Sequence, residues 1–278
     1  MDPLAFLRFV PDFSSPRVLA AYDELPLWSA MFGLLLLDEV PLAGAKVVLD
    51  VGCGTGFPLI ELAERLGTAS HVHGLDPWSA GLERAKEKLA ARGTTNVTLH
   101  DGSANAMPYR AGTFDLIVSN LGVNNFDDRA GALRECRRVA KRGAVIALTT
   151  NLQGHMQELY DLFDEVLERA GDPEARRLLR DHVAHRATVA GVRDLLQDSG
   201  FSTVRAVERT AVMRFASGSA LFNHHFIKLG FLDGWKSIVP GRETEMFLRL
   251  LRRLDEVAAE RGELRLTIPM AYIEAVTA

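Results

Sequence analysis

A turn with three glycines constrains the fold of this chain more than any other feature. The five residues V-V-L-D-V before the turn are apolar apart from one acid, a pattern typical of a strand buried on both faces of a parallel sheet. The residues L-I-E-L-A-E-R-L after it predict a helix that ends at Gly67. The turn itself holds Gly52, Gly54 and Gly56. Because glycine has no Cβ, a ligand can approach this backbone closely, and the start of the helix adds a positive dipole end.

The spacing of the glycines and one acid indicate which ligand the turn binds. A dinucleotide-binding turn has its third glycine three residues after the second, and that position is Phe57 here. The Lys-Ser or Lys-Thr pair of a phosphate-binding loop does not follow either. Asp50 places a carboxylate directly before the turn, where a bound cation could meet it, and Cys53 lies inside the turn. The run D-V-G-C-G-T-G closely resembles the first motif of class I S-adenosylmethionine-dependent methyltransferases, which implies that this segment binds S-adenosylmethionine.

The composition of the chain excludes several classes of partner. A length of 278 residues suits one domain with an added cap, and a net charge of −4 gives no basic face for nucleic acid. Cys53 and Cys136 have no metal-ligand spacing, so we expect no bound metal and a reducing, cytoplasmic location. The longest apolar run, 31–37, is too short to cross a membrane.

An acid ends the second predicted strand, at 71–76. Asp76 lies 20 residues after Gly56, and an acid at the tip of this strand can accept hydrogen bonds from both hydroxyls of a ribose. Pro77 and Trp78 follow it directly, and we expect both to border the cofactor. The indole of Trp78 either packs against an adenine face or covers the protein surface, and the sequence favours neither.

The segment G-S-A-N-A-M-P-Y after the third predicted strand resembles the part of the same family whose acid meets the adenine amino group. The position of that acid holds Ser103 here, between Gly102 and Ala104. Asp101 lies two residues before it. The resemblance therefore implies adenine contacts from Gly102, Ser103 and Ala104, and it leaves open whether Ser103 or Asp101 supplies the polar group.

The fourth predicted strand, 112–120, matches the family through its sequence F-D-L-I-V-S-N. Its carboxyl end is expected to meet the same crevice as the glycine turn, because ligands of open α/β sheets bind at the carboxyl ends of the strands. The resemblance implies that Asn120 and Leu121 border the methionine part of S-adenosylmethionine. Asn124 and Asn125 either orient a substrate or only shape the loop.

Three more strands complete a predicted α/β fold, a Rossmann-like sheet of seven mostly parallel strands with helices on both faces. The basic residues 141–143 are expected to turn into a fifth strand at 144–149. A sixth strand is predicted at 204–215, after a glycine–aromatic turn. The last strand, at 264–276, is expected to be antiparallel.

The chain is predicted to consist of three parts. Residues 1–45 form a helical lid, in which Tyr22 either covers the ligand or packs as a half-buried ring. Residues 46–150 form the core that binds S-adenosylmethionine. Residues 151–278 complete the sheet and insert a helical cap, which is expected to form the substrate pocket.

The resemblance implies an enzyme that moves the methyl group of S-adenosylmethionine to a small-molecule acceptor by in-line displacement, with S-adenosylhomocysteine as product. Such a transfer needs positioning in a pocket without water rather than a covalent nucleophile. A general base helps only when the acceptor has a high pKa. The candidate catalytic residues are His155, His224 and Tyr22. His224 is followed by His225, and such a pair with no further ligand spacing is more typical of packing than of metal binding.

Two other functions stay open at this point. A protein that binds S-adenosylmethionine without catalysis would carry the same binding residues. A nicotinamide-dependent oxidoreductase would share the strand, turn and helix, although the third glycine of its fingerprint is missing. The core looks most like methyltransferases of ubiquinone and menaquinone biosynthesis, which does not identify the acceptor. Aromatic residues in the inserted segment favour an aromatic or hydrophobic acceptor, and we expect a monomer or a homodimer.

Overall fold

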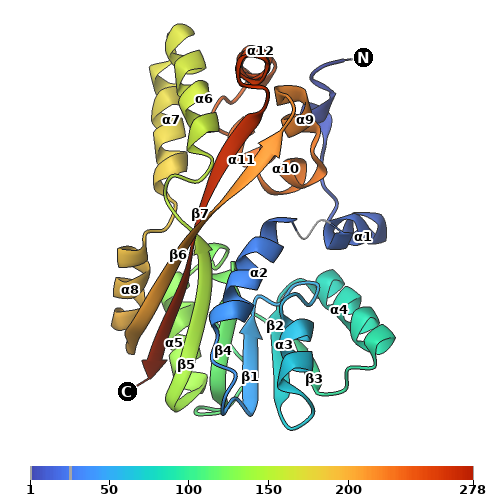
Figure 1. Cartoon of the computed structure of the whole chain (residues 1–278), viewed down its shortest axis with the longest axis vertical. Helices are drawn as coiled ribbons and strands as arrows, with labels where there is room; N and C mark the ends of the chain where they lie inside the picture. The colour runs from blue at the N-terminus through green and yellow to red at the C-terminus, as the bar shows by residue number, and fades with distance from the viewer. Residues whose placement is uncertain (1, 25–26, 278) are drawn as a thin grey trace. The chain divides into compact units, whose positions relative to one another are not determined.

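The computed structural model describes residues 2–24 and 27–277, and the strands of this part form one seven-stranded sheet (Figure 1). The strand order is β3-β2-β1-β4-β5-β7-β6. Strands β1 to β5 pair in parallel and β7 runs antiparallel to β5, as predicted. The strands are β1 (Val47–Val51), β2 (His71–Asp76), β3 (Val97–Asp101), β4 (Phe114–Asn120), β5 (Ala140–Asn151), β6 (Phe201–Phe215) and β7 (Leu264–Thr277).

Helices follow most strands, and two of them begin at an acidic N-cap. The side chain of Asp128 accepts a hydrogen bond from the Gly131 amide at 2.8 Å, and Asp172 caps a helix whose first residue is Pro173. No helix in the described part of the chain has the length and apolar character needed to cross a membrane. The helices are η1 (Ala5–Arg8), α1 (Pro16–Glu24), α2 (Leu27–Glu39), α3 (Leu59–Leu66), α4 (Ser79–Arg92), η2 (Gly122–Asn124), α5 (Arg129–Val139), α6 (Gln157–Arg169), α7 (Pro173–Ala184), α8 (Val189–Asp198), α9 (Gly218–Asn223), α10 (His225–Gly230), α11 (Leu232–Lys236) and α12 (Glu243–Arg261).

The start of the fifth strand differs from the prediction. Residues 141–143 do not turn into a strand but belong to β5, which begins at Ala140. Lys141 forms an ion pair with Asp115 of β4 at 2.7 Å, which holds this extension against its neighbour. The φ of 72° at Gly143 accompanies a shift of register between the two strands. A basic, glycine-containing run was therefore wrongly interpreted as a turn, because it forms an irregular strand end.

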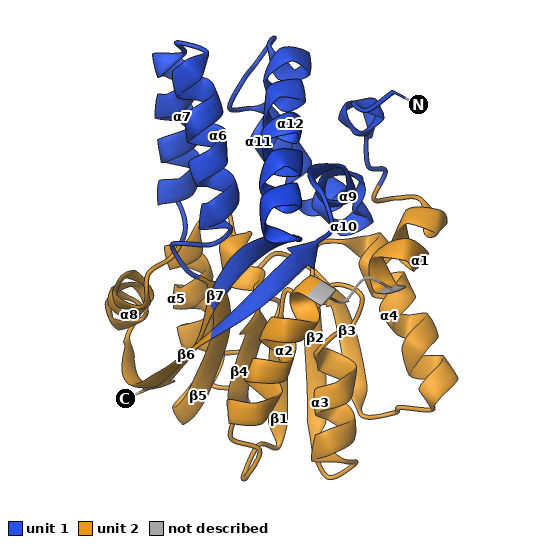
Figure 2. Cartoon of the chain, turned by 45° about the horizontal axis from the view of Figure 1, so that its top comes forward, with its two compact units in different colours: residues 1–12, 152–186, 210–269 blue, residues 13–151, 187–209, 270–278 orange. Residues whose placement is uncertain are grey.

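The chain divides into two compact units, each built from separate stretches of sequence (Figure 2). Unit 1 contains most of the helices that the sequence predicts as a cap, from α6, α7 and α9 to α12. Unit 2 contains β1 to β5 with α1 to α5 and α8. Strands β6 and β7 contribute to both units. Unit 1 comprises residues 1–12, 152–186 and 210–269, and unit 2 comprises residues 13–151, 187–209 and 270–278.

Unit 1 has an aromatic and aliphatic core of its own. Helix α12 packs against α6 and α9 with an apolar face that recurs every three or four residues. The ring of Phe222 stacks on Phe6 at 4.7 Å between centroids, and Phe247 lies 5.5 Å from Phe222 and 6.0 Å from Phe163. The buried residues of α12 are Met246, Phe247, Leu250, Leu251, Leu254, Val257 and Ala258.

In unit 2, the N-terminal helix α1 is tied to α4 by one half-buried acid. Asp23 accepts hydrogen bonds from Arg84 at 2.8 Å and from Lys88 at 2.7 Å, and its side chain is only 11% exposed. Burial alone would raise the pKa of Asp23, but the bonds from Lys88 and Arg84, with a further bond from Thr55, lower it below its ordinary value. Thr55 belongs to the glycine turn, so Asp23 connects α1, α4 and that turn.

We expect Asp23→Asn to loosen α1 locally. The two ion pairs are lost while the rest of unit 2 is unchanged, so hydrogen exchange of the amides in 16–24 becomes faster by about 5- to 30-fold, for a local loss of about 1–2 kcal/mol. Asp38→Asn is the matched control, because Asp38 is more than half exposed in its pair with Arg209. Equal exchange rates in α1 for both variants would contradict the tether.

Candidate functional site

The glycine turn is fixed by backbone hydrogen bonds to the end of β2. The amides of Gly52 and Cys53 both donate to the carbonyl of Leu75, at 2.8 and 3.3 Å. The amide of Gly56 donates back to the carbonyl of Cys53 at 2.8 Å. Cys53 is buried, and its burial raises the pKa of its thiol, so it acts as a small apolar residue within the turn. The turn is thus tight and rigid.

Glycine is favoured at positions 52, 54 and 56 of the turn for different physical reasons. All three have a positive φ, which side chains disfavour. A Cβ on Gly56 would lie 2.9 Å from Ile60 Cδ1, and a Cβ on Gly52 would lie 3.2 Å from Gly122 Cα. A Cβ on Gly54 would meet no described atom within 4 Å. Gly56 and Gly52 therefore allow close packing, whereas Gly54 borders open space that a ligand could fill.

Asp50, at the end of β1, is a buried carboxyl without a partner. Neither of its oxygens has a hydrogen-bond partner among residues 2–24 and 27–277, and its relative exposure is 0%. Burial, with a smaller contribution from the charge of Asp76, raises the pKa of Asp50 to about 8. Because a buried, unbonded carboxyl destabilises the fold, a cation beside it would supply what the protein lacks.

Asp76, at the end of β2, lies against the glycine turn. One carboxylate oxygen accepts the amide of Gly54 and the other accepts the amide of Trp78, both at 2.8 Å. Burial raises the pKa of Asp76, and the two amides oppose that shift. Each oxygen keeps a free lone pair, so two further donors such as ribose hydroxyls can bind. The structure therefore brings together Asp50, Asp76 and Gly54, as the sequence predicts.

Aromatic residues from the N-terminal segment surround Trp78. Its indole N–H donates to the carbonyl of Phe13 at 3.1 Å, and the rings of Phe13 and Tyr22 lie edge-on at 6.0 and 5.5 Å. Burial, followed by the charges of Asp76 and Asp23, raises the pKa of Tyr22. Pro77, between Asp76 and Trp78, is exposed. Tyr22 thus packs against Trp78, whose indole N–H is already bonded within the protein.

The residues predicted to contact adenine lie beyond β3. The amide of Gly102 donates to the carbonyl of Asp76 at 3.2 Å, and Ala104 is buried. Ser103 is exposed, and its hydroxyl accepts the amide of Asn105 at 3.1 Å. Asp101 accepts a short hydrogen bond from the hydroxyl of Ser79, at the start of α4. Both alternatives for the polar group, Ser103 and Asp101, therefore already have a bond inside the protein.

The end of β4 approaches the glycine turn from the other side. The Asn120 amide donates to the carbonyl of Ser29 at 3.1 Å, and its oxygen accepts the hydroxyl of Thr149 at 2.7 Å. Leu121 has a φ of 64°, a conformation that residues with a branched side chain rarely adopt away from functional sites. Both the nitrogen and the oxygen of the Asn120 side-chain amide are thus bonded within the protein. Leu121 has the strained backbone conformation.

Asn124, a possible substrate contact, is bonded to the last residues of β5. Its amide nitrogen donates to Asn151 Oδ1 at 2.9 Å, and its oxygen accepts the Thr150 hydroxyl at 2.6 Å. The amide of Asn125 donates to the carbonyl of Gly122 at 2.9 Å, closing η2. These bonds support the interpretation that the Asn124 side chain shapes the loop.

The histidines predicted as possible bases all lie in unit 1. His155 is buried, with its ring 5.5 Å from Phe231, and burial, then the charge of Arg186, lowers its pKa to about 3. His224 lies edge-on to Phe215 at 5.5 Å, and burial lowers its pKa as well. A base with a pKa of about 3 removes protons poorly at neutral pH. Catalysis by either histidine stays a prediction.

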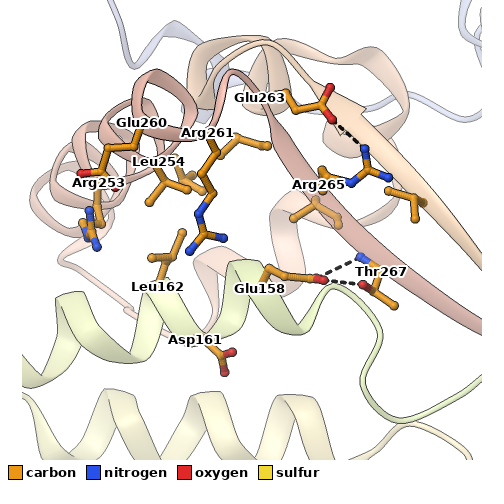
Figure 3. Close-up of a pocket in the computed structure, with 14 residues that line it drawn as sticks. Glu158, Asp161, Leu162, Arg253, Leu254, Glu260, Arg261, Glu263, Arg265 and Thr267 are labelled. Carbon is orange, nitrogen blue, oxygen red and sulfur yellow. Dashed lines mark hydrogen bonds and ion pairs between the residues drawn. The ribbon is translucent and has the colours of Figure 1, made fainter.

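A pocket of about 450 Å³ lies within unit 1, between α6, α12 and β7 (Figure 3). Its lining includes none of the residues predicted from the sequence. Glu158 bonds to Thr267, and Arg265 pairs with Glu263 at 2.7 Å, while the Arg261 side chain reaches into the pocket. The residues that line this pocket all belong to unit 1.

Tyr160, His182 and Arg186 of unit 1 form a group that no sequence motif indicates. Tyr160 lies on α6, and its hydroxyl is 3.3 Å from Nε2 of His182, near the end of α7. Only the structure places them together.

Known proteins resemble this chain over the part that holds the glycine turn. A family profile described as "Methyltransferase domain" matches residues 42–189. The chain is 32% identical to a demethylmenaquinone methyltransferase of Shouchella clausii over 177 residues, which are 60% of this chain and 75% of that protein. It is 28% identical to a nocamycin O-methyltransferase of Saccharothrix syringae over 251 residues, 86% of this chain and 88% of that protein.

A solved structure with the same fold is that of a SAM-dependent methyltransferase from Aquifex aeolicus. Its TM-score is 0.54 at 23% identity, covering 69% of this chain and 92% of that one. The family profile spans β1 to β5 together with the glycine turn and both acids that lie beside it. This chain therefore belongs to the class I S-adenosylmethionine-dependent methyltransferases.

Proposed function

We propose that the protein transfers the methyl group of S-adenosylmethionine to an oxygen atom of a small-molecule acceptor. The observation that carries the proposal is the buried, unpartnered carboxyl of Asp50 beside the open space at Gly54. S-adenosylmethionine carries two cationic groups, an ammonium and a sulfonium. Either would give Asp50 the opposite charge that the described residues do not provide.

The neighbouring residues would hold the nucleoside. Asp76 keeps lone pairs for the ribose hydroxyls after accepting the amides of Gly54 and Trp78. Gly102 and Ala104, with Ser103 or Asp101, would border the adenine, and Leu121 the methionine chain. Tyr22 would cover the ribose side, because its pKa already responds to the charge of Asp76.

When bound, S-adenosylmethionine supplies an electrophilic methyl group, and S-adenosylhomocysteine remains. The residues of this chain would hold both reactants in line and keep water out, which is most of the catalysis such a reaction needs. The lowered pKa of the buried His155 agrees with a mechanism that depends on positioning, because this ring is a weak proton acceptor.

The choice of an oxygen acceptor is supported by the extent of the resemblance. The relative named as an O-methyltransferase aligns with 86% of the chain, whereas the relative named for demethylmenaquinone aligns with 60%. The longer alignment has to include part of unit 1, where the acceptor residues would lie. The aromatic core of unit 1 suits a flat or hydrophobic acceptor. A reducing cytoplasm is the expected compartment, because both cysteines are free and buried.

We expect calorimetric titration to give micromolar binding of S-adenosylmethionine and S-adenosylhomocysteine. Asp76→Asn removes a charged acceptor and should raise both dissociation constants by about 10- to 150-fold, since a hydrogen bond to a charged group contributes about 1.5–3 kcal/mol. The control is Asp194→Asn, an exposed acid of α8 that should bind as wild type. Binding of NAD instead would overturn the proposal. Binding without turnover on any acceptor would leave a non-catalytic binding protein.

Binding of S-adenosylmethionine at pH 7 should release about one proton. Asp50 has a pKa of about 8 and is protonated at that pH, and a bound cation favours the ionised carboxylate. Binding enthalpies in phosphate and Tris buffers should therefore differ by the buffers' heats of protonation. Asp50→Asn should remove that difference. A wild-type enthalpy that is independent of buffer would contradict the role of Asp50.

The same carboxyl should make the stability of the free protein fall as the pH rises. With its pKa raised from 3.8 to about 8, Asp50 binds a proton in the folded chain that the unfolded chain has lost. Its contribution is full below pH 3.8 and is lost as the pH rises to about 8. Urea denaturation at pH 5 and pH 8 should thus show a larger loss of stability in the wild type than in Asp50→Asn.

A further inference from the structure

Unit 1 contains a group of aromatic and basic side chains that the proposed function has not used. Its members come from the loop before α6, from α6 itself, from the end of α7, and from α11 with the residue before it. All of them belong to unit 1. We call this group the basic aromatic cluster, and it consists of His155, Tyr160, His182, His185, Arg186, Phe231 and Trp235.

One side of the cluster is a wall of rings. Phe231 lies 5.5 Å from His155 and stacks on Trp235 at 5.7 Å with an interplanar angle of 21°. The indole N–H of Trp235 donates to the hydroxyl of Tyr160 at 3.2 Å. Trp235, Tyr160 and His155 are all buried. Phe231 is only half-buried, so it is the ring of this wall that a flat, apolar molecule would meet.

The other side of the cluster carries the basic groups. The hydroxyl of Tyr160 and Nε2 of His182 are 3.3 Å apart, and the rings of His182 and His185 lie edge-on at 5.2 Å. Arg186 Nη1 lies 2.7 Å from His185 Nε2. Ring contacts and hydrogen bonds thus join each member to the next, from Phe231 to Arg186.

Arg186 carries the positive charge of this cluster, since His155 and His182 are neutral at pH 7. Burial is the largest cause of their lowered pKa values, followed by Arg186, His182 and His185 for His155 and by Arg186 and His185 for His182. The Nε of Arg186 is buried and has no acceptor among residues 2–24 and 27–277. A buried guanidinium N–H without an acceptor is costly, and an anion is the partner that removes this cost.

We infer that the basic aromatic cluster binds the acid group of the methyl acceptor, an oxygen acid that is ionised at neutral pH, such as a carboxylic acid or an acidic enol, on a flat apolar body. Arg186 pairs with the acid, and Phe231 packs against the body. This inference rests on the proposed function and narrows its acceptor class.

An acceptor that is already ionised explains why His155 and His182 need not be strong bases. The acceptor oxygen already carries the electron pair that forms the new oxygen–carbon bond, while the carbon–sulfur bond breaks and its pair stays on sulfur. No proton leaves, so no general base is required. His155 and His182, with pKa values lowered to about 3 and about 4 chiefly by burial, are neutral donors or acceptors and not bases here.

The pocket of Figure 3 is a weaker place for an acid. Arg253 is paired with Glu165 at 3.1 Å and Arg265 with Glu263 at 2.7 Å. Arg261 reaches into the pocket, but Asp161 and Glu260 line it too. Its acids would repel an anion, whereas Arg186 of the basic aromatic cluster has a buried N–H without an acceptor among the described residues.

The test compares an acid with its uncharged amide. 2-Naphthoate and 2-naphthamide are titrated into the whole protein by calorimetry, with and without S-adenosylhomocysteine. Wild type should bind the acid at least about tenfold more tightly than the amide, because a charge-assisted pair to arginine is lost in the amide. Arg186→Gln should abolish the preference, and Arg186→Lys should restore part of it. The control is Arg193→Gln, an exposed cation of α8, which should keep the preference.

The outcomes separate the inference from the proposed function. S-adenosylhomocysteine should bind Arg186→Gln as it binds wild type, which also checks that the variant is folded. If S-adenosylhomocysteine binds but the acid and the amide bind equally, or neither binds, the inference is overturned and the proposed function stands. If the acid is preferred but S-adenosylhomocysteine does not bind, the proposed function fails and the cluster is an acid site without a methyl donor.

Discussion

The carboxyl of Asp50 is the constraint on which the rest of unit 2 depends. It is fully buried at the end of the central strand β1, and neither oxygen is bonded within the described chain. Such a group costs stability unless it stays protonated or meets a cation, so burial and Asp76 raise its pKa to about 8. The tight glycine turn, the bonds of Asp76 to Gly54 and Trp78, and the α1 tether at Asp23 keep the surroundings of this carboxyl rigid. A rigid site with an unpaired acid is already organised for a cation.

The close approach of two turns explains the strain beside this site. The Ser119 hydroxyl donates to the carbonyl of Val51 at 2.6 Å, and the turn after β4 comes so near that a Cβ on Gly122 would lie 2.7 Å from that carbonyl. Leu121, between them, takes a left-handed conformation. The surrounding bonds hold this strained residue in place, as is typical of a residue beside a ligand site. The region at the carboxyl ends of β1 and β4 is therefore shaped by backbone packing, and close contacts require glycine at Gly52 and Gly122.

Local patterns predicted most of unit 2, because its elements follow one another along the chain with strong signals. The strand before Gly52, the helix after the glycine turn and the strand that ends in Asp76 each depend on neighbours within a few residues. Residues 141–143 were misassigned because their strand conformation depends on β4, which includes Asp115 and is distant in sequence. The basic aromatic cluster could not be predicted, since it joins residues from 155 to 235 through contacts of long range. Patterns of short range were sufficient for the strands that carry Asp50 and Asp76, and the role of these two acids in binding stays a prediction.

The two units differ in the ionisable groups that they bury. Unit 2 buries the acids Asp50 and Asp76, and burial raises the pKa of both. Unit 1 buries His155 and part of His182, and burial lowers the pKa of both rings, so they are neutral at pH 7. Burial is thus one physical cause with two opposite effects on pKa, because in each case it disfavours the charged form of the group. Within unit 2 that cost is removed by a cation, and within unit 1 the buried N–H of Arg186 is satisfied by an anion.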